Sequence, residues 1–124
     1  MSQQRARIGR IGERIAVRHL EAAGLDVLTR NWRCAGGEVR GEVDIVAADG
    51  STLVVCEVKT RRRVQAGEPL VAVDGRKARQ LRRLAGAWLA TDGRRWSSVR
   101  VDVVAVSWPP GGGGPDVVHV RGGA

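Results

Sequence analysis

The chain has 124 residues, 43% of them hydrophobic, which predicts one globular domain over residues 1–124 and argues against a disordered protein. It carries 21 Lys and Arg against 13 Asp and Glu, and a net charge of +8 on so small a chain favours a polyanionic partner. No apolar run approaches the roughly 20 residues of a membrane-spanning helix. No apolar segment follows the early arginines as in a secretory signal. We therefore expect a cytoplasmic protein without membrane association.

The first predicted element is an amphipathic helix over residues 7–23. Its apolar side chains recur at helical spacing, and Gly24 follows where a C-terminal glycine cap is common. Glu13 lies inside the edge of the apolar arc, so its carboxylate is expected to be partly buried. The alternative for Glu13 is a surface side chain that turns outward to solvent.

Three strands are predicted next. A short strand covers residues 25–29, and two longer ones cover 42–48 and 53–60. Asp49-Gly50 lies between the longer runs and indicates a β-hairpin. The run over 53–60 is apolar on both faces up to Glu57, which is typical of a central strand.

The rest of the chain continues the alternation of helix and strand. We predict a loop over 61–74, a basic amphipathic helix over 76–90, a strand over 99–106, a flexible Pro/Gly-rich loop over 107–116 and an edge strand over 117–121. The order α-β-β-β-α-β-β predicts an α/β domain with a mixed central sheet flanked by helices.

The hairpin brings three charged residues to one face. Residues two apart on a strand share a face, so Glu57 and Lys59 point the same way. With Asp49-Gly50 as a two-residue turn, paired residues sum to 99 and Asp44 lies diagonal to Glu57; with a four-residue loop they sum to 101 and the two acids are opposite. Either register leaves about 5–8 Å between their Cβ atoms. Two carboxylates at that separation can share one cation.

The apolar surroundings make such a pair costly without a cation. Like charges on a half-buried surface repel, and one acid should shift towards its protonated form. A bound Mg²⁺ or Mn²⁺ would remove that repulsion, acidify a water and stabilise charge on a phosphodiester. The alternative is an ordinary salt-bridged cluster on a solvated sheet face.

The lysine in this group is unusual for the chain. The sequence holds nineteen arginines and two lysines, and yet Lys59 is the basic residue beside Glu57. A lysine can lose its proton, and its compact ammonium fits close to a metal-bound water. Lys59 is a candidate for orienting the nucleophile, assisting proton transfer or neutralising the phosphate, and the sequence does not choose among these roles.

Four blocks of the sequence resemble the YraN family of small bacterial proteins. They are GERIAVRHLEAAGLDVLTRNWR, GEVDIVAADGSTLVVCEVKTR, VDGRKARQLRRLA and RVDVVAV, and together they cover most of residues 9–106. The family is assigned to the restriction-endonuclease-like superfamily, whose motif is written PD-(D/E)xK, and it is similar to Holliday-junction resolvases. The resemblance implies a restriction-endonuclease-like fold and a metal-dependent nuclease activity on DNA. A resolvase-like role would favour a homodimer.

The superfamily motif carries over to four positions. The resemblance implies that Glu13, Asp44 and Glu57 are metal ligands and that Lys59 is the catalytic cation. Val43 stands where the motif has proline, a position at which proline is often missing.

Basic residues near the motif are candidate phosphate contacts. Arg61, Arg62 and Arg63 follow Lys59 closely, and Lys77 and Gln80 on the predicted helix are within plausible reach of the site. The alternatives are a solvated loop and a plain basic helix face. Asp102 is interpreted as a structural partner for an arginine.

Three functions remain open from the sequence. The first is a Mg²⁺- or Mn²⁺-dependent DNA endonuclease acting on branched or other structured DNA. The second is a catalytically silent nucleic-acid-binding protein that retains the nuclease fold, and the third is a small structural protein with a salt-bridged acidic cluster.

Overall fold

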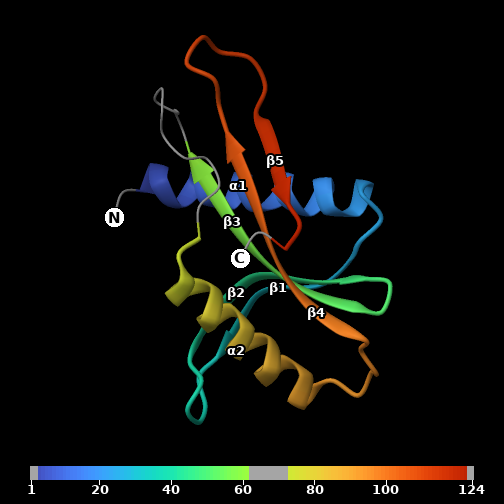
Figure 1. Cartoon of the computed structure of the whole chain (residues 1–124). Helices are drawn as coiled ribbons and strands as arrows, with labels where there is room; N and C mark the ends of the chain where they lie inside the picture. The colour runs from blue at the N-terminus through green and yellow to red at the C-terminus, as the bar shows by residue number, and fades with distance from the viewer. Residues whose placement is uncertain (1–2, 62–72, 123–124) are drawn as a thin grey trace.

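The computed structural model describes residues 3–61 and 73–122. Two helices and one five-stranded sheet account for most of them (Figure 1). In chain order the elements are α1 (Gln3–Ala22), β1 (Asp26–Cys34), β2 (Gly41–Asp49), β3 (Thr52–Arg61), α2 (Gly75–Thr91), β4 (Ser98–Ser107) and β5 (Asp116–Val120). Neither helix has the length and apolar character that crossing a bilayer requires, within the residues described.

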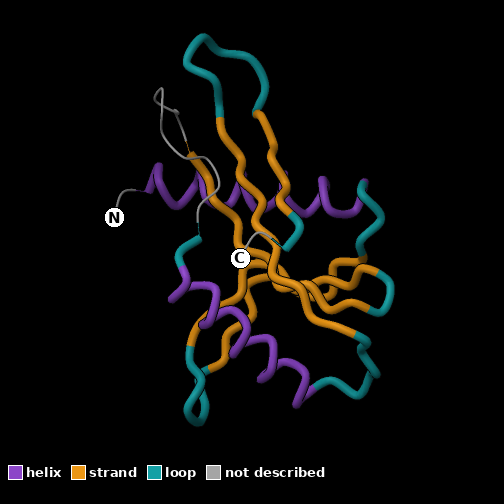
Figure 2. Tube along the Cα trace, in the orientation of Figure 1, coloured by secondary structure: helices purple, strands orange, loops and turns teal. Residues whose placement is uncertain are grey.

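The sheet is mixed, and its strands lie in chain order from β1 to β5. Only β3 and β4 run parallel, because α2 carries the chain back between them; the other neighbours are antiparallel. One apolar cluster packs α1 against the sheet through Ala16 and Leu20, and a second packs α2 through Leu81 and Leu84. The helices therefore cover opposite faces (Figure 2). The predicted restriction-endonuclease-like α/β fold and element order are confirmed.

The β2–β3 hairpin adopts the register in which paired residues sum to 101. Ile45 pairs with Cys56 and Asp49 with Thr52. The turn consists of Gly50 and Ser51 alone, so the four-residue loop that we associated with this register is wrong. Gly50 has a φ of 59°. A left-handed residue at the first turn position suits the tight hairpin turns whose twist matches the strands.

Strand β1 is longer than predicted. It continues through the Asn31-Trp32-Arg33 segment because β2 offers a pairing edge as far as Cys34 opposite Gly41. A register shift between Val27 and Thr29 and the φ of 52° at Asn31 accommodate the extra length. Asn tolerates the left-handed region better than most residues.

Two predicted loops also change their limits. Arg61 belongs to β3 and pairs with Ser107 of β4, while Arg62 and Arg63 lie outside the described residues. Ser107 also pairs with Asp116, so the Pro/Gly-rich connection between β4 and β5 covers residues 108–115.

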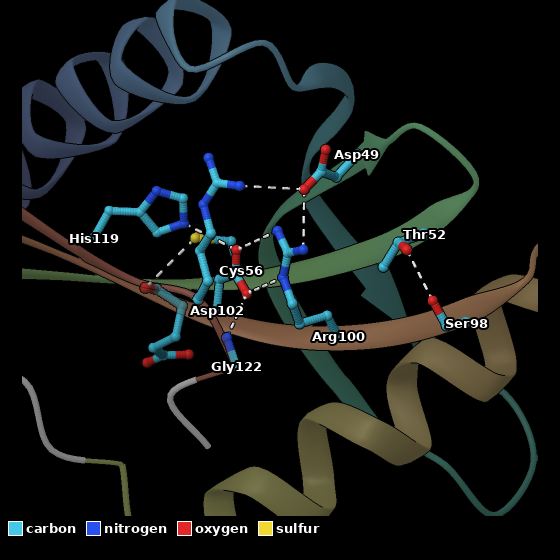
Figure 3. Close-up of polar contacts among 10 residues, drawn as sticks. Asp49, Thr52, Cys56, Ser98, Arg100, Asp102, His119 and Gly122 are labelled. Atoms are coloured by element: carbon cyan, nitrogen blue, oxygen red, sulfur yellow. Dashed lines mark hydrogen bonds and ion pairs between the residues drawn. The ribbon is translucent and has the colours of Figure 1, made fainter.

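A buried polar cluster joins β4 to the end of the chain (Figure 3). Asp102 has an exposed fraction of 0%, and its carboxylate accepts hydrogen bonds from Arg100 at 2.8 and 3.1 Å. It also bonds the His119 ring at 2.9 Å and accepts the backbone N–H of Gly122 at 2.9 Å. Arg100 reaches Asp49 at 2.9 Å as well, which ties the hairpin end of β2 to the cluster. The predicted pairing of Asp102 with an arginine is confirmed.

Candidate active site

Asp44 lies where β2 separates from β3. The paired residues of the two strands end at Ile45 and Cys56, and beyond them the Asp44 carboxylate accepts the backbone N–H of Val58 at 2.8 Å. The side chain thus satisfies a backbone donor that the neighbouring strand would otherwise satisfy. This bond holds the Asp44 carboxylate against β3, near the start of the Glu57-Val58-Lys59 segment.

Neighbouring carboxylates act on Asp44. Burial and the charges of Glu57 and Glu13 together raise the pKa of Asp44 to about 6, against the lowering effect of the hydrogen bond from the Val58 N–H. Lys77 opposes the rise. Asp44, Glu57, Glu13 and Lys77 therefore interact electrostatically in one site. The ionised form of Asp44 is less stable there than it is in the unfolded chain.

Glu57 continues the face of β3 that packs against α2. Leu53 and Val55 of that face belong to the α2-side core, and Glu57 follows at the same alternation. Its carboxylate lies 3.5 Å from Nζ of Lys77 in the first turn of α2. The Glu57 side chain is 19% exposed and that of Lys77 45%, so this pair sits at the rim of the site.

Lys59 follows Glu57 on the same face and is half-buried. Its charge lowers the pKa of Asp74, the N-cap of α2, where the backbone N–H of Lys77 has the larger effect. Both lysines of the chain, among nineteen arginines, therefore act on this one region between β3 and the start of α2.

Glu13 approaches from α1 on the other side of the sheet. It accepts a hydrogen bond from the Asn31 amide at 3.3 Å, which fixes the direction of its carboxylate. Gly12 allows this approach, because a Cβ there would overlap the side chain of Thr60 in β3. The close packing of α1 on β3 at Gly12 therefore positions Glu13 relative to the hairpin.

The fit at Gly12 gives a first prediction. Gly12→Ala should lower the free energy of unfolding by about 1–3 kcal/mol, because the added methyl group overpacks the contact with Thr60. Gly9→Ala is the matched control: its Cβ would meet nothing within 4 Å, and a helical Gly→Ala change there should stabilise by about 0.5–1 kcal/mol. Urea denaturation of both variants measures the difference. Equal effects of the two substitutions would contradict the close approach.

The predicted site residues are brought together only in part. Asp44, Glu57 and Glu13 interact through their charges, but within residues 3–61 and 73–122 no three His, Cys, Asp or Glu side chains form a group ready to hold a metal ion. Glu42, on the same strand as Asp44, pairs with Arg33 at 3.4 Å.

The donor set nevertheless fits an open Mg²⁺ site. Mg²⁺ is usually held by one or two carboxylates together with waters and substrate phosphates, rather than by a closed protein cage. Asp44 and Glu57 supply two partly buried carboxylates, and the raised pKa of Asp44 marks a place where added positive charge would be favourable.

Two contacts of α2 were not foreseen in the sequence. Lys77 was predicted to contact nucleic acid, and its ion pair with Glu57 is new. Gln80 donates a hydrogen bond to the backbone carbonyl of Arg40, which anchors α2 at the start of β2. The rarity of lysine was the one signal in the sequence that could have singled out Lys77 together with Lys59.

Comparison with known proteins places the chain in a family. The model of an uncharacterised protein family, UPF0102, matches residues 12–106. The chain belongs to the UPF0102 family. This is the YraN family that the sequence resembles, so that prediction is confirmed. The matched residues of UPF0102 include the candidate acids, both lysines and all of β2, β3, α2 and nearly all of β4.

Curated UPF0102 proteins match over almost their whole length. A protein from Kineococcus radiotolerans is 54% identical and covers 93% of this chain and 91% of its own. Its counterpart from Acidothermus cellulolyticus is 49% identical, with coverages of 95% and 93%. The Streptomyces coelicolor protein is 50% identical, with coverages of 95% and 88%. Each is named only as a UPF0102 protein, so the activity has to be argued from the site.

Proposed function

We propose that this protein is a metal-dependent nucleic-acid phosphodiester hydrolase, a DNA endonuclease. The observation that carries the proposal is the environment of Asp44, a partly buried carboxylate whose pKa is raised to about 6 by burial and by the charges of Glu57 and Glu13. An ion pair lowers the pKa of an acid, whereas burial and neighbouring carboxylates raise it, and acids with strongly shifted pKa values cluster at functional sites. The restriction-endonuclease-like fold supports the same activity.

Each residue has a role in this proposal. Asp44 and Glu57 would hold Mg²⁺ or Mn²⁺, with Glu13 contributing from α1. The cation would supply charge stabilisation for the phosphodiester and acidify a water. Lys59 brings a compact cation to the same face as Glu57, where its ammonium orients the attacking water and balances charge on the phosphate. The Val58 N–H keeps the Asp44 carboxylate in place.

The salt-bridged alternative is disfavoured by the contacts of Asp44. Among the described residues, no cation lies within ion-pair distance of its carboxylate, and its hydrogen bond goes to a backbone N–H. Lys77 of the Lys77–Glu57 pair is 45% exposed, and ion pairs open to solvent contribute only about 0–1 kcal/mol. Stability alone therefore gives little reason to gather these carboxylates.

A catalytically silent nucleic-acid-binding protein is the second candidate. One contact favours it: Lys77 already compensates the charge of Glu57 at 3.5 Å. In that case the +8 chain would bind DNA equally well with Mg²⁺ or with a chelator.

A cleavage screen tests the proposal. The purified protein is incubated with linear, single-stranded, flapped and four-way DNA in Mg²⁺, Mn²⁺ or EDTA, and products are separated on denaturing gels. We expect cleavage of at least one substrate with metal and none with EDTA. Lys59→Ala should lower the rate by about 10²-fold, as expected for loss of a general acid–base or charge-stabilising group.

Arg95→Ala is the control for that variant, because Arg95 is exposed and follows the C-terminal end of α2, whereas the site lies at the first turn of that helix. It removes one positive charge, as Lys59→Ala does, and should leave the cleavage rate unchanged. If the protein cuts none of these DNA forms with either metal, the proposed endonuclease activity is wrong, and catalytically silent nucleic-acid binding is the function that remains.

A further inference from the structure

The first half of α2 carries a high density of positive charge. Five basic residues fall within eight positions and no acid lies anywhere in the helix: Arg76, Lys77, Arg79, Arg82 and Arg83. Like charges three and four residues apart on a helix repel one another, and the positive end of the helix dipole adds to the effect. A bound polyanion would reduce this repulsion.

The same side chains line an open groove. The groove has a volume of about 570 Å³ and is lined by Asp74, Arg76, Lys77, Arg79, Gln80 and Arg83. Asp74 is the only carboxylate among the described residues that line it, and its oxygen accepts a hydrogen bond from the backbone N–H of Lys77 at 2.8 Å. Arg79 and Arg83 are exposed and have no ion pair with any of the described residues. The groove therefore presents guanidinium groups to solvent.

One end of the groove reaches the candidate active site. Lys77 lines the groove and its Nζ lies 3.5 Å from Glu57. Lys59 acts electrostatically on Asp74 at the same end. A chain of phosphates lying in the groove would thus be directed towards Glu57 and Asp44.

We propose that this groove binds the phosphodiester backbone of DNA, with Arg76, Arg79 and Arg83 contacting successive phosphates of one strand. These three positions follow helical spacing on one face. At 1.5 Å per residue they span about 10 Å of helix axis, against about 7 Å of duplex axis for the two steps that separate three successive phosphates, a difference that long arginine side chains can bridge. The binding rests on the groove alone, while the direction of the strand towards a cleaved bond rests on the proposed function.

Salt-dependent binding tests the groove. Affinity for a fluorescent 20-base-pair duplex is measured by anisotropy in EDTA from 50 to 300 mM salt. Each phosphate contact contributes about 0.9 to the slope of log affinity against log salt. Replacing Arg76, Arg79 and Arg83 with glutamine should therefore reduce the slope by about 2–3 and weaken binding at least about 10-fold at low salt.

The matched control removes the same charge from the other helix. Arg10, Arg14 and Arg18 are exposed on α1, which covers the opposite face of the sheet, and their triple glutamine variant has the same net charge as the α2 variant. Its slope should stay within about 1 of the wild type. Circular dichroism establishes that both variants remain folded. If both variants lose the same DNA affinity and salt slope, or if the wild type does not bind DNA, the proposal that the groove binds DNA is wrong.

Two further readouts separate this inference from the proposed activity. If the α2 variant loses binding but the wild type cuts no DNA, the groove binds DNA and the proposed endonuclease activity is wrong. If the wild type cuts DNA and the α2 variant keeps the full salt slope, the endonuclease activity is supported and DNA binding by the groove is wrong. Binding to RNA of the same length without binding to DNA would overturn the assignment of DNA as the ligand.

Discussion

Asp44→Asn is expected to abolish DNA cleavage while making the protein more stable at neutral pH. Asparagine keeps an oxygen to accept the Val58 N–H but loses the charge that Glu57 and Glu13 oppose. Loss of a metal-binding carboxylate should lower the cleavage rate by at least about 10³-fold. Removal of an ionised group whose pKa is raised from 3.8 to about 6 should add about 1–3 kcal/mol to the free energy of unfolding.

The pH dependence of this gain has a definite sign. The pKa of Asp44 is higher in the folded protein than in the unfolded chain, so its ionisation favours unfolding. The variant and the wild type should be equally stable below pH 3.8, and the advantage of the variant should grow up to about pH 6 and then level off. Urea denaturation of the metal-free proteins between pH 3.5 and 8 is the measurement, over a range set by that shift.

Glu42→Gln is the matched control for Asp44→Asn. Glu42 lies on the same strand, but it pairs with the exposed Arg33, and its loss should change stability by no more than about 0.5 kcal/mol at any pH. Adding Mg²⁺ should stabilise the wild type and leave Asp44→Asn unchanged, because only the wild type gains from binding. A loss of stability in Asp44→Asn at pH 7.5 would show that Asp44 is a structural ion-pair partner.

Asp102→Ala is expected to lower the free energy of unfolding by about 3–5 kcal/mol, the usual cost of breaking a buried charge pair by removing one partner. The carboxylate is fully buried and serves Arg100, His119 and Gly122 at once (Figure 3). Its loss leaves the guanidinium and the imidazole without their shared acceptor. Equilibrium urea unfolding at pH 7 measures the change.

The loss of stability caused by Asp102→Ala should become smaller at acidic pH. Burial favours the neutral acid, but hydrogen bonds from Arg100, Gly122 and His119 outweigh it and hold the pKa of Asp102 below its usual value. The stabilisation is therefore present above the unfolded pKa of 3.8 and is lost as the pH falls through the lower folded pKa. Asp116→Ala, an exposed acid on β5, should change stability by less than about 0.5 kcal/mol. A similarly small effect of Asp102→Ala would refute the role of the cluster.

Local patterns predicted the fold and one face of the candidate site. Period-two alternation is enough to place Glu57 and Lys59 on the same face of β3, and this placement is the same for either hairpin register. The sequence did not decide the hairpin register, because Asp49-Gly50 and Gly50-Ser51 can both form a two-residue turn. In the folded protein Asp49 pairs with Thr52, so Gly50-Ser51 is the turn.

Contacts between distant elements were beyond the sequence patterns. Strand β1 extends to Cys34 because β2 provides an edge there, which residues 30–34 do not reveal by themselves. The Lys77–Glu57 pair depends on how α2 packs on β3, and the bond from Gly122 to Asp102 depends on the β4–β5 pairing. Spacing along the chain specifies none of these distances.

During synthesis of the protein, β3 is translated before β4, so one edge of β3 lacks its neighbouring strand for some time. The partner of Thr52 in β4 is Ser98, 46 residues later, so a nascent chain presents one open edge of β3 until α2 and β4 have followed. That edge belongs to the apolar run Leu53–Cys56, the most buried stretch of the strand. Open apolar edges recruit other chains and promote aggregation. Fragments that stop before β4 are therefore the species most prone to aggregate, although they already contain Asp44, Glu57 and Lys59.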